Sequence, residues 1–478
     1  VIIQDCRGTG ESEGQWQPFE NERLDGIDSL KWLNEQSWVR SIATFGRSYS
    51  SYTQWIVGDC LPDKVKTMFL EVYGINRFNQ VYNNGLFRED IYTSWAFANS
   101  GVKSDISTGQ QYQKALEIYP AIMRDQKILG CQLPFYQDYL THINKEDDYW
   151  EKSIWKILED VPSKINIPVV VTDGWADHHL EGGLQGFENL RPEIKKQSKL
   201  IITPTDHVNA TTGDLKYPDA DKYGFMNAKA ALIWFNHILK GSSENLESGL
   251  YQMRSGKWLE PIDIENTCEK KIYLEPEVLT DEINANENQF ISYRYNPKNS
   301  NTWLGGNELL AWITPGFTDL PHGFVKTDKY EKREDVLMFC SKKYEEGLDI
   351  RGEITLNLSV ATDKEDTAFC VRICEKTVDG KYINIKDAGT SILGNKSLAI
   401  ESYIPGQKID LKISFGKVVW NLHPGSALVL LISSSNFPMY SIHSNKKGLW
   451  SCQDIDENIA EQKVYVNGKS YINIKIAR

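Results

Sequence analysis

Hydrophobic residues in the first part of the chain follow two spacings, one typical of strands and one typical of helices. Short apolar runs at 1–5, 41–45 and 66–72 indicate strands, and a glycine-rich turn follows the first of them. Residues 20–36 place leucine and isoleucine at helical spacing on one broad face, which predicts a helix. Strands that alternate with helices predict βαβ units and a mainly parallel sheet.

The pattern changes twice along the rest of the chain. Residues 76–159 are polar and aromatic with helix-like patches, so we expect a helical lid there. The alternation of strands and helices resumes at 160–245 and completes the α/β domain that residues 1–75 begin. From 246 to 478, hydrophobic residues recur at every second position between Gly, Pro, Asn and Asp turns, which predicts an all-β sandwich.

The net charge narrows the classes of partner. The 478 residues carry a formal charge of −12, which argues against a nucleic-acid binder because such a protein needs a basic face. The same charge disfavours docking on an anionic membrane, and the longest apolar stretches, such as 427–432, are too short to span a bilayer. We therefore expect no nucleic-acid partner and no membrane partner. The oligomeric state stays open, a homodimer included.

The cysteines and the first residue bear on the compartment and the completeness of the chain. Eight cysteines are scattered without the spacing of a disulfide framework, so we interpret them as reduced core thiols of a cytoplasmic protein. Cys370 and Cys374 could face one way on a strand, but no histidine or second cysteine pair joins them, and we expect no metal site. Val1 stands within a strand pattern and no methionine precedes it, so we expect the sequence to begin inside a domain.

The segment Gly46-Arg47-Ser48-Tyr49-Ser50 lies between a predicted strand and a predicted helix, as a nucleophile elbow requires. So tight a turn needs small residues two positions before and after the nucleophile, and Gly46 and Ser50 satisfy this need. The turn would raise the Ser48 hydroxyl above the sheet and place the Tyr49 backbone N–H at the helix start, where it favours an oxyanion. On spacing alone, an ordinary strand-to-helix turn is an equally good interpretation.

A serine nucleophile needs a histidine base and a carboxylate that orients the histidine, and after an elbow of this type the chain order is Ser, Asp, His. Asp177 follows a predicted strand at 168–172, and His207 follows the next predicted strand at 199–203. Trp175, two positions before Asp177, is a candidate for the substrate pocket. Asp173 is a rival for the acid, although it could instead cap the turn that follows it.

The other candidate side chains have plainer interpretations. His178 and His179 lie close to a strand end, but they precede any plausible carboxylate partner. His423 and His443 fall in the β region, where we expect them to be turn or surface residues. Asp206 cannot readily reach the ring of its own neighbour, so we interpret it as a loop residue.

Several segments of the chain form a recognisable set. They are Asp5–Gly14, Asp25–Trp32, Gly46–Tyr49, Gly174-Trp175-x-Asp177, Pro204-x-x-His207 and the β region from Gly352 to Pro438. Together they resemble the cocaine-esterase and Xaa-Pro dipeptidyl-peptidase (S15) family, also called CocE/NonD hydrolases, over nearly the whole chain. The resemblance implies an α/β-hydrolase domain with a helical lid insertion, followed by an all-β jelly-roll of the galactose-binding-like type.

The resemblance also implies an acyl hydrolase that cleaves esters or amides through an acyl-enzyme, with no cofactor and no metal. Carried over to this sequence, it makes Ser48 the nucleophile, His207 the general base and acid, and Asp177 the residue that orients His207. The Tyr49 N–H would be one oxyanion donor. In the family a tyrosine in strands before the Asp-x-Arg-Gly segment supplies the second donor, and no residue of this sequence can be assigned that role.

Two further functions stay open. A dipeptidyl-peptidase needs a carboxylate to hold the free amine of its substrate, and Asp173 and Glu181 are candidates for that carboxylate. A non-catalytic protein could instead use its jelly-roll to bind carbohydrate or another partner. The first hypothesis is a general hydrolase whose substrate is a small-molecule ester, an amide or a peptide.

Overall fold

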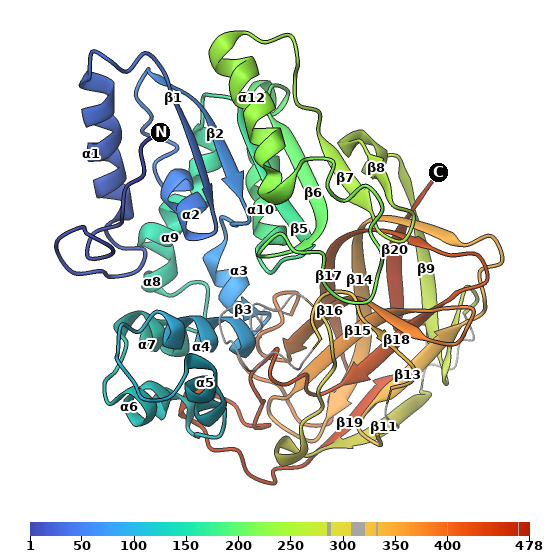
Figure 1. Cartoon of the computed structure of the whole chain (residues 1–478). Coiled ribbons are helices and arrows are strands. Elements are labelled where there is room, and N and C mark those ends of the chain that lie inside the picture. The colour runs from blue at the N-terminus through green and yellow to red at the C-terminus, as the bar shows by residue number, and fades with distance from the viewer. Residues whose placement is uncertain (284–287, 307–320, 331–332, 399, 467) are drawn as a thin grey trace. The chain divides into compact units, whose positions relative to one another are not determined.

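The computed structural model describes residues 1–283, 288–306, 321–330, 333–398, 400–466 and 468–478. These residues form two compact units, whose elements are labelled in Figure 1. Unit 1 comprises 1–80, 144–210 and 219–250, and unit 2 comprises 81–143, 211–218 and 251–478. The segment 81–143 thus groups with the β region, whereas 144–159 groups with the parallel sheet. The domain boundaries inferred from the sequence stay a prediction.

Unit 1 begins with a helix and then alternates strands and helices. Its strands are β1 (Ile42–Arg47), β2 (Val65–Glu71), β5 (Val169–Ala176), β6 (Lys199–Asp206) and the start of β7 (Gly249–Gln252). Its α-helices are α1 (Glu22–Glu35), α2 (Tyr49–Trp55), α3 (Arg77–Val81), α8 (Asp148–Glu151), α9 (Ile154–Asp160), α10 (Leu180–Glu188), α11 (Pro192–Lys195) and α12 (Ala228–Lys240). Short 3₁₀ helices are η2 (Val161–Lys164) and η3 (Phe225–Asn227).

The strands of unit 1 form a parallel sheet in the order β1-β2-β5-β6-β7. Helix α2 packs on β1 and β2, α12 on β2, and α10 on β5 (Figure 1). Nearly all residues of β2 and β5 are buried, which explains their continuous apolar runs. Parallel strands bring their carboxyl ends to one edge, so Arg47, Glu71, Ala176 and Asp206 end at the same edge of the sheet.

The core of unit 1 lies between this sheet and its helices. Phe69, Val170 and Ile201, in the three middle strands, are fully buried. Trp234 of α12 is also buried, and its indole N–H donates to Thr67 Oγ1 at 2.7 Å. The one polar atom of this large side chain is therefore satisfied inside the core, as a buried indole requires.

Unit 2 contains a helical segment and the β region. The helical segment has the hairpin β3 (Tyr82–Asn83) and β4 (Leu86–Phe87), then α4 (Glu89–Ala98), α5 (Thr108–Leu116), η1 (Ala121–Met123), α6 (Arg124–Leu129) and α7 (Pro134–Thr141). The first strands of the β region are β8 (Lys257–Leu259), β9 (Thr267–Glu275), β10 (Val278–Thr280), β11 (Phe290–Tyr295), β12 (Lys326–Thr327) and β13 (Leu337–Ser341). The later strands are β14 (Leu348–Thr362), β15 (Ala368–Lys376), β16 (Tyr382–Ser391), β17 (Ile409–Leu422), β18 (Ala427–Ser433), β19 (Ala460–Tyr465) and β20 (Tyr471–Ala477). Short 3₁₀ turns are η4 (Pro261–Ile264), η5 (Pro297–Asn299) and η6 (Trp450–Cys452).

The β region pairs mainly antiparallel. Its strands follow the path β11-β19-β14-β20-β9-β10-β13-β18-β15-β16-β12, and β17 pairs with β14. Ile354, Leu356 and Leu358 of β14 are fully buried, while Glu353 between two buried positions is exposed. The period of two that the sequence shows therefore places one face of this strand in the core, and the predicted all-β domain is confirmed. No helix among the described residues of the chain is long and apolar enough to cross a membrane.

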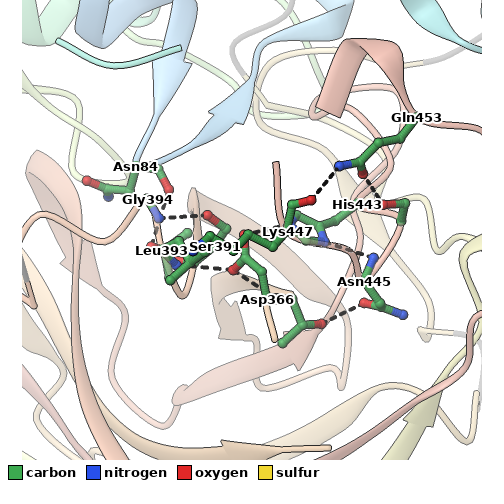
Figure 2. A network of polar contacts seen from close by, with 12 residues as sticks. Asn84, Asp366, Ser391, Leu393, Gly394, His443, Asn445, Lys447 and Gln453 are labelled. Atoms are coloured by element: carbon green, nitrogen blue, oxygen red, sulfur yellow. Dashed lines mark hydrogen bonds and ion pairs between the residues drawn. The ribbon is translucent and has the colours of Figure 1, made fainter. Parts of the chain in front are cut away.

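The β3–β4 hairpin forms hydrogen bonds that connect the helical segment to the β region within unit 2. Ser391 donates its backbone N–H to the Asn84 carbonyl at 3.0 Å, and Gly394 donates its N–H to the Ser391 hydroxyl at 2.9 Å (Figure 2). A Cβ built on Gly394 would lie 2.4 Å from the Gly85 Cα, so the two backbones touch and glycine is required at this point. The helical segment is therefore held by main-chain contacts at its first hairpin.

His443 is buried, which makes the expected surface or turn position wrong. Its Nε2 lies 3.3 Å from Oδ2 of Asp366, and its Nδ1 accepts the Asn445 N–H at 3.0 Å (Figure 2). Both ring nitrogens thus have partners, which is how a polar ring is accommodated in a protein interior. Asp366 lies 77 residues away along the chain, so no local pattern of residues indicates this pair.

The strand predicted at residues 1–5 does not form. Val1, Ile2 and Ile3 are exposed and have no strand hydrogen bonding. An apolar run becomes a strand only where a neighbouring strand pairs with it, and among the described residues β1, at the edge of its sheet, pairs with β2 alone.

The cysteines divide by position. Cys370 and Cys374 are buried in β15, as expected of core thiols. The interpretation of all eight as core thiols is wrong, because four are exposed: Cys60, Cys131, Cys268 and Cys452.

Candidate active site

Ser48 stands at the turn between β1 and α2. Its φ of 50° and ψ of −121° form a strained conformation that non-glycine residues rarely adopt, and such strain concentrates at functional sites. The Ser48 N–H donates to the Glu71 carbonyl at 3.0 Å, which holds the turn against β2. A Cβ on Gly46 would lie 2.5 Å from the Ser50 carbonyl oxygen, so glycine is required two positions before the serine. The strand, turn and helix of a nucleophile elbow are therefore all present.

Three side chains from the ends of three strands meet at this turn. The Ser48 Oγ lies 2.8 Å from Nε2 of His207, and Nδ1 of His207 lies 2.8 Å from Oδ2 of Asp177. The Asp177 side chain is fully buried and the His207 side chain is 6% exposed. A carboxylate can only accept here, so His207 donates from Nδ1, and the Nε2 lone pair faces the Ser48 hydroxyl.

Backbone contacts fix the Asp177 carboxylate. The His179 N–H donates to its Oδ1 at 2.7 Å, and the Asp177 N–H donates to the Gly174 carbonyl at 3.0 Å. A Cβ on Gly174 would lie 2.2 Å from the Thr205 carbonyl oxygen. The ends of β5 and β6 can therefore approach each other only because residue 174 is glycine, and this approach brings Asp177 to His207.

Asp206 holds the loop that carries His207. Its Oδ1 accepts the N–H of Val208 at 3.0 Å and the N–H of Ala210 at 2.9 Å. The Asp206 N–H donates to the Ala210 carbonyl at 2.9 Å, which closes the loop on itself. Asp206 is the last residue of β6 and not the loop residue that we expected, and its contacts give the loop that follows it a fixed shape.

Arg47, the residue before Ser48, reaches the same loop from β1. Its Nη2 donates to the His207 carbonyl oxygen at 2.6 Å, and its Nε lies 3.7 Å from Oε2 of Glu71. The side chain of Glu71 is fully buried, whereas that of Arg47 is 16% exposed. The guanidinium thus ties the backbone of the histidine loop to the strand that precedes the nucleophile.

Glu71, at the end of β2, has an unusual ionisation. Burial raises the pKa of its carboxyl to about 7, although the Asn227 amide and the Arg47 guanidinium both act to lower it. Asn227 donates to Oε1 of Glu71 at 2.9 Å. A carboxyl that changes charge near neutral pH thus lies against the arginine that touches the His207 loop.

Tyr49 contributes its backbone and its side chain in different ways. Its N–H belongs to the first turn of α2, where helix N–H groups have no intrahelical acceptor and point out of the helix end. Its phenol donates to the Glu22 carboxylate and accepts the Phe19 N–H at 2.8 Å. Burial, followed by the Glu22 charge, raises the pKa of the Tyr49 phenol well above its ordinary range. The side chain is therefore anchored to Glu22 and Phe19, and the backbone N–H lies at the start of the helix.

The other predicted site residues lie at or beside the end of β5. Trp175 is 5% exposed within β5, and Asp173 is 1% exposed. The Asp173 Oδ1 accepts the Gly174 N–H at 2.8 Å. The carboxylate that contacts Nδ1 of His207 belongs to Asp177 and not to its rival Asp173. Glu181 is exposed in the first turn of α10.

His178 and His179 lie beside His207. The ring centroids of His178 and His207 are 4.7 Å apart, and those of His179 and His207 are 5.4 Å apart. His179 also stacks on Tyr73 with the ring centroids 4.6 Å apart. Besides Asp177, two imidazoles that the sequence interpretation had left without a role thus lie beside the base.

Two regions of the chain match known families. The X-Pro dipeptidyl-peptidase (S15 family) region matches residues 1–209, and the X-Pro dipeptidyl-peptidase C-terminal non-catalytic domain matches residues 259–454. The chain therefore carries two regions that match the catalytic part and the C-terminal part of S15 hydrolases. This S15 hydrolase is similar to cocaine esterase from Rhodococcus sp. (strain MB1 Bresler), with 23% identity over 495 residues that cover 96% of this chain and 84% of the esterase. The family indicated by the sequence motifs is thereby confirmed.

Solved structures share the fold of the S15 hydrolase. An aminopeptidase from the marine sediment archaeon Thaumarchaeota archaeon has a TM-score of 0.86 at 16% identity, and the match covers 99% of this chain and 84% of that one. An α-amino acid ester hydrolase has a TM-score of 0.83 at 18% identity, with the same coverage of 99% and 84%. A CocE/NonD family hydrolase from Staphylococcus aureus has a TM-score of 0.65 at 14% identity, covering 99% and 78%. The predicted α/β-hydrolase fold followed by an all-β domain is confirmed.

Arg47, Glu71 and Asn227 were missed by the sequence interpretation of the S15 hydrolase. Arg47 stands inside the elbow motif, and Glu71 ends a strand on the site side of the sheet, so each had a positional signal. Asn227 precedes α12 with a positive φ of 52°, and its contact with Glu71 spans 156 residues. Only the folded chain reveals that these three side chains connect.

Proposed function

We propose that the S15 hydrolase cleaves an ester or amide bond through an acyl-enzyme on Ser48, with His207 as general base and Asp177 as its orienting carboxylate. The observation that carries the proposal is the pair of 2.8 Å contacts that join Ser48 to His207 and His207 to Asp177. A serine hydroxyl is a poor nucleophile until a base takes its proton, and this arrangement supplies the base. The names of the relatives, cocaine esterase and α-amino acid ester hydrolase, point to the same class of bond.

Acylation begins with proton transfer. As the Ser48 Oγ forms a bond to the carbonyl carbon of the substrate, its proton moves to Nε2 of His207, and the carbonyl oxygen becomes an oxyanion. The Asp177 carboxylate stabilises the imidazolium that results. The imidazolium then gives the same proton to the leaving alcohol or amine as the carbon–heteroatom bond breaks, and the acyl group stays on Ser48.

Deacylation repeats these steps with water. His207 takes a proton from the water molecule as its oxygen attacks the acyl carbon, and it returns the proton to the Ser48 Oγ as that oxygen leaves. In both halves the negative oxygen needs donors that are already in place. The Tyr49 N–H at the start of α2 is our candidate for one such donor, because the helix dipole also favours negative charge there.

We propose a general ester or amide hydrolase rather than a dipeptidyl-peptidase. The second activity needs a carboxylate free to hold a substrate amine. The Asp173 carboxylate accepts the Gly174 N–H, and Glu181 is exposed on α10. The rings beside His207 are the imidazoles of His178 and His179. The proposal therefore covers acyl groups with and without a free amine, and Trp175 is a candidate wall of the pocket.

The setting of this activity follows from charge and thiol chemistry. The net charge of −12 supports a small-molecule or peptide substrate rather than nucleic acid or an anionic membrane surface. The cysteines in the described part of the chain are free, which supports a reducing compartment such as the cytoplasm.

The test is hydrolysis of a 4-nitrophenyl ester by the wild type and by two serine variants of the elbow. Ser48→Ala should abolish turnover, because Ser48 supplies the oxygen that lies 2.8 Å from Nε2 of His207. Ser50→Ala, two residues away and exposed, should retain it. Turnover by a folded Ser48→Ala protein equal to that of the wild type would refute the assignment of the nucleophile. No turnover by the folded wild type on esters or amides would favour the alternative of a non-catalytic binding protein.

A further inference from the structure

Three imidazoles converge at the end of β5 and β6. The ring nitrogens of His178, His179 and His207 that could bind a metal all lie within 4.8 Å of one another. The ring centroids of His178 and His179 are 4.0 Å apart. Neutral imidazole is the commonest protein ligand of transition metals, and three imidazoles suffice for a zinc site whose fourth position holds water or another small ligand.

Asp177 gives this cluster the environment of a metal site. Its Oδ2 contacts Nδ1 of His207 at 2.8 Å, and its Oδ1 lies 3.4 Å from Nδ1 of His178. A carboxylate on the far nitrogen of a histidine ligand is the usual outer support of zinc sites, because it fixes the ring and makes the other nitrogen more basic. The buried negative charge of Asp177 also favours a cation nearby.

We propose that the S15 hydrolase has an inhibitory zinc site formed by His178, His179 and His207. Since Nδ1 of His207 is engaged by Asp177, zinc binds its Nε2, which otherwise faces the Ser48 hydroxyl. His178 and His179 each supply one further nitrogen, and water takes the fourth position. The contacts that prepare His207 to accept a proton from serine also prepare it to bind a divalent transition metal.

Zinc on Nε2 blocks the reaction by occupying a lone pair. In the metal-free protein that lone pair accepts the Ser48 proton, whereas in the zinc-bound protein it forms the coordinate bond, and the hydroxyl keeps its proton. No electron transfer is involved, and the free histidine returns when the metal is removed by a chelator. This inhibitory effect rests on the proposed role of His207, but metal binding by the three imidazoles does not.

The ligand nitrogens must close on the metal. Nitrogens bound to one zinc at about 2.0–2.1 Å lie roughly 3.4 Å from each other, so nitrogens that now lie within 4.8 Å of one another must approach by at most about 1.4 Å. His178 and His179 both lie between the end of β5 and the start of α10, and the His179 ring is also stacked on Tyr73. Zinc fits the cluster better than calcium or magnesium, which prefer oxygen ligands.

The experiment measures zinc binding and zinc inhibition separately. Isothermal titration of ZnCl₂ is made on Ser48→Ala, which retains all three imidazoles, and on Ser48→Ala combined with His178→Gln, His179→Gln or His207→Gln. The control carries His142→Gln and His237→Gln, the same chemical change at two histidines outside the cluster. Exposed cysteines contribute equally to all these proteins, so the comparison isolates the cluster. Ester turnover of the wild type and of the His178→Gln and His179→Gln proteins is then followed against zinc concentration, with and without a chelator.

We expect one zinc bound by Ser48→Ala and by the control, and at least about tenfold weaker binding when a cluster histidine is replaced, since even outer support of a ligand is worth roughly 10–100-fold in metal affinity. The zinc concentration for half inhibition should rise by a similar factor in His178→Gln and His179→Gln. Equal zinc binding in the cluster variants and the control would overturn the proposal, as would an active wild type that zinc does not inhibit. Zinc binding that depends on the cluster in a wild type without turnover would support the site while refuting the proposed function.

Discussion

Arg47 donates to the carbonyl oxygen of His207 at 2.6 Å, although 160 residues separate the two along the chain. The residue before the proposed nucleophile therefore touches the backbone of the proposed base. The 2.8 Å contact between the Ser48 Oγ and the His207 Nε2 depends on the relative position of two strand ends, β1 and β6. The arginine links these two ends directly. Its guanidinium also lies 3.7 Å from the carboxylate of Glu71, at the end of β2.

The first prediction concerns Arg47. Arg47→Met should lower kcat/KM for an ester by about 10–100-fold, because a displacement of about 1 Å between nucleophile and base can cost about 100-fold. The exposed Arg40→Met is the matched control and should have no effect. Arg47→Met leaves the buried Glu71 carboxylate without its arginine, and the double variant Arg47→Met, Glu71→Gln removes that charge as well. The double variant should remain as slow as Arg47→Met, because the contact with the His207 carbonyl is missing in both. Recovery of the wild-type rate in that double variant would show that the carbonyl contact is unimportant.

The second prediction separates the two carboxylates at the end of β5. Asp177→Asn should reduce kcat by about 10⁴-fold, because the amide can donate to Nδ1 and so favours the wrong tautomer of His207. Asp173→Asn, the same change four residues earlier, should leave most of the activity, since the Asp173 side chain accepts the Gly174 N–H. If Asp173→Asn were the slower of the two, the acid would have been assigned to the wrong residue.

The third prediction follows from the pKa of Glu71, which burial raises from its ordinary value of 4.5 to about 7. Between these pH values the folded protein binds more protons than the unfolded chain, so the stabilising effect is present at low pH and is lost as pH rises through 7. The loss amounts to about 3 kcal/mol of unfolding free energy. Glu71→Gln cannot ionise, so its unfolding free energy should fall less between pH 5 and 8 than that of the wild type.

Urea unfolding at pH 5, 6, 7 and 8 measures this difference. Glu181→Gln replaces an exposed carboxyl and should keep the wild-type pH dependence. Parallel curves for the wild type and Glu71→Gln over the whole range would contradict the raised pKa.

The fourth prediction concerns a buried ion pair in the helical segment of unit 2. The Arg124 Nη1 lies 2.7 Å from Oε2 of Glu89, and both side chains are fully buried. Arg124→Met should lower the unfolding free energy by about 3–5 kcal/mol, because it leaves the carboxylate buried without its cation. Lys156→Met removes the cation of an exposed pair with Asp160 and should cost less than about 1 kcal/mol. Similar unfolding midpoints for the two variants would show that the buried pair has no special weight.

Much of the site could be predicted because its determinants are local. Gly46 and Ser50 flank Ser48 at the spacing that a tight strand-to-helix turn requires, and the structure shows why, since a side chain at 46 would collide with the Ser50 carbonyl. Asp177 and His207 could be selected because each follows a recognisable strand. The parallel sheet then brings those strand ends together without any further information.

The rest depends on contacts between residues far apart in the sequence. Glu71 is a carboxylate at a strand end, and nothing nearby in sequence indicates that Arg47 and Asn227 surround it. The partner of the buried His443 ring, Asp366, is likewise distant in the sequence. The apolar residues Val1–Ile3 show the opposite error, because hydrophobicity favours a strand but only a partner strand can form one.

The most direct test of the central claim is labelling with a fluorophosphonate probe, followed by mass spectrometry to locate the adduct. The probe reacts with a serine that a base has activated, and 2.8 Å contacts link Ser48 through His207 to Asp177. We predict one adduct on Ser48 in the wild type and in Ser50→Ala, and none in Ser48→Ala or in His207→Gln. A folded wild type that gives no adduct, or an adduct on another serine, would contradict the claim that this chain holds an activated nucleophile at the β1–α2 turn.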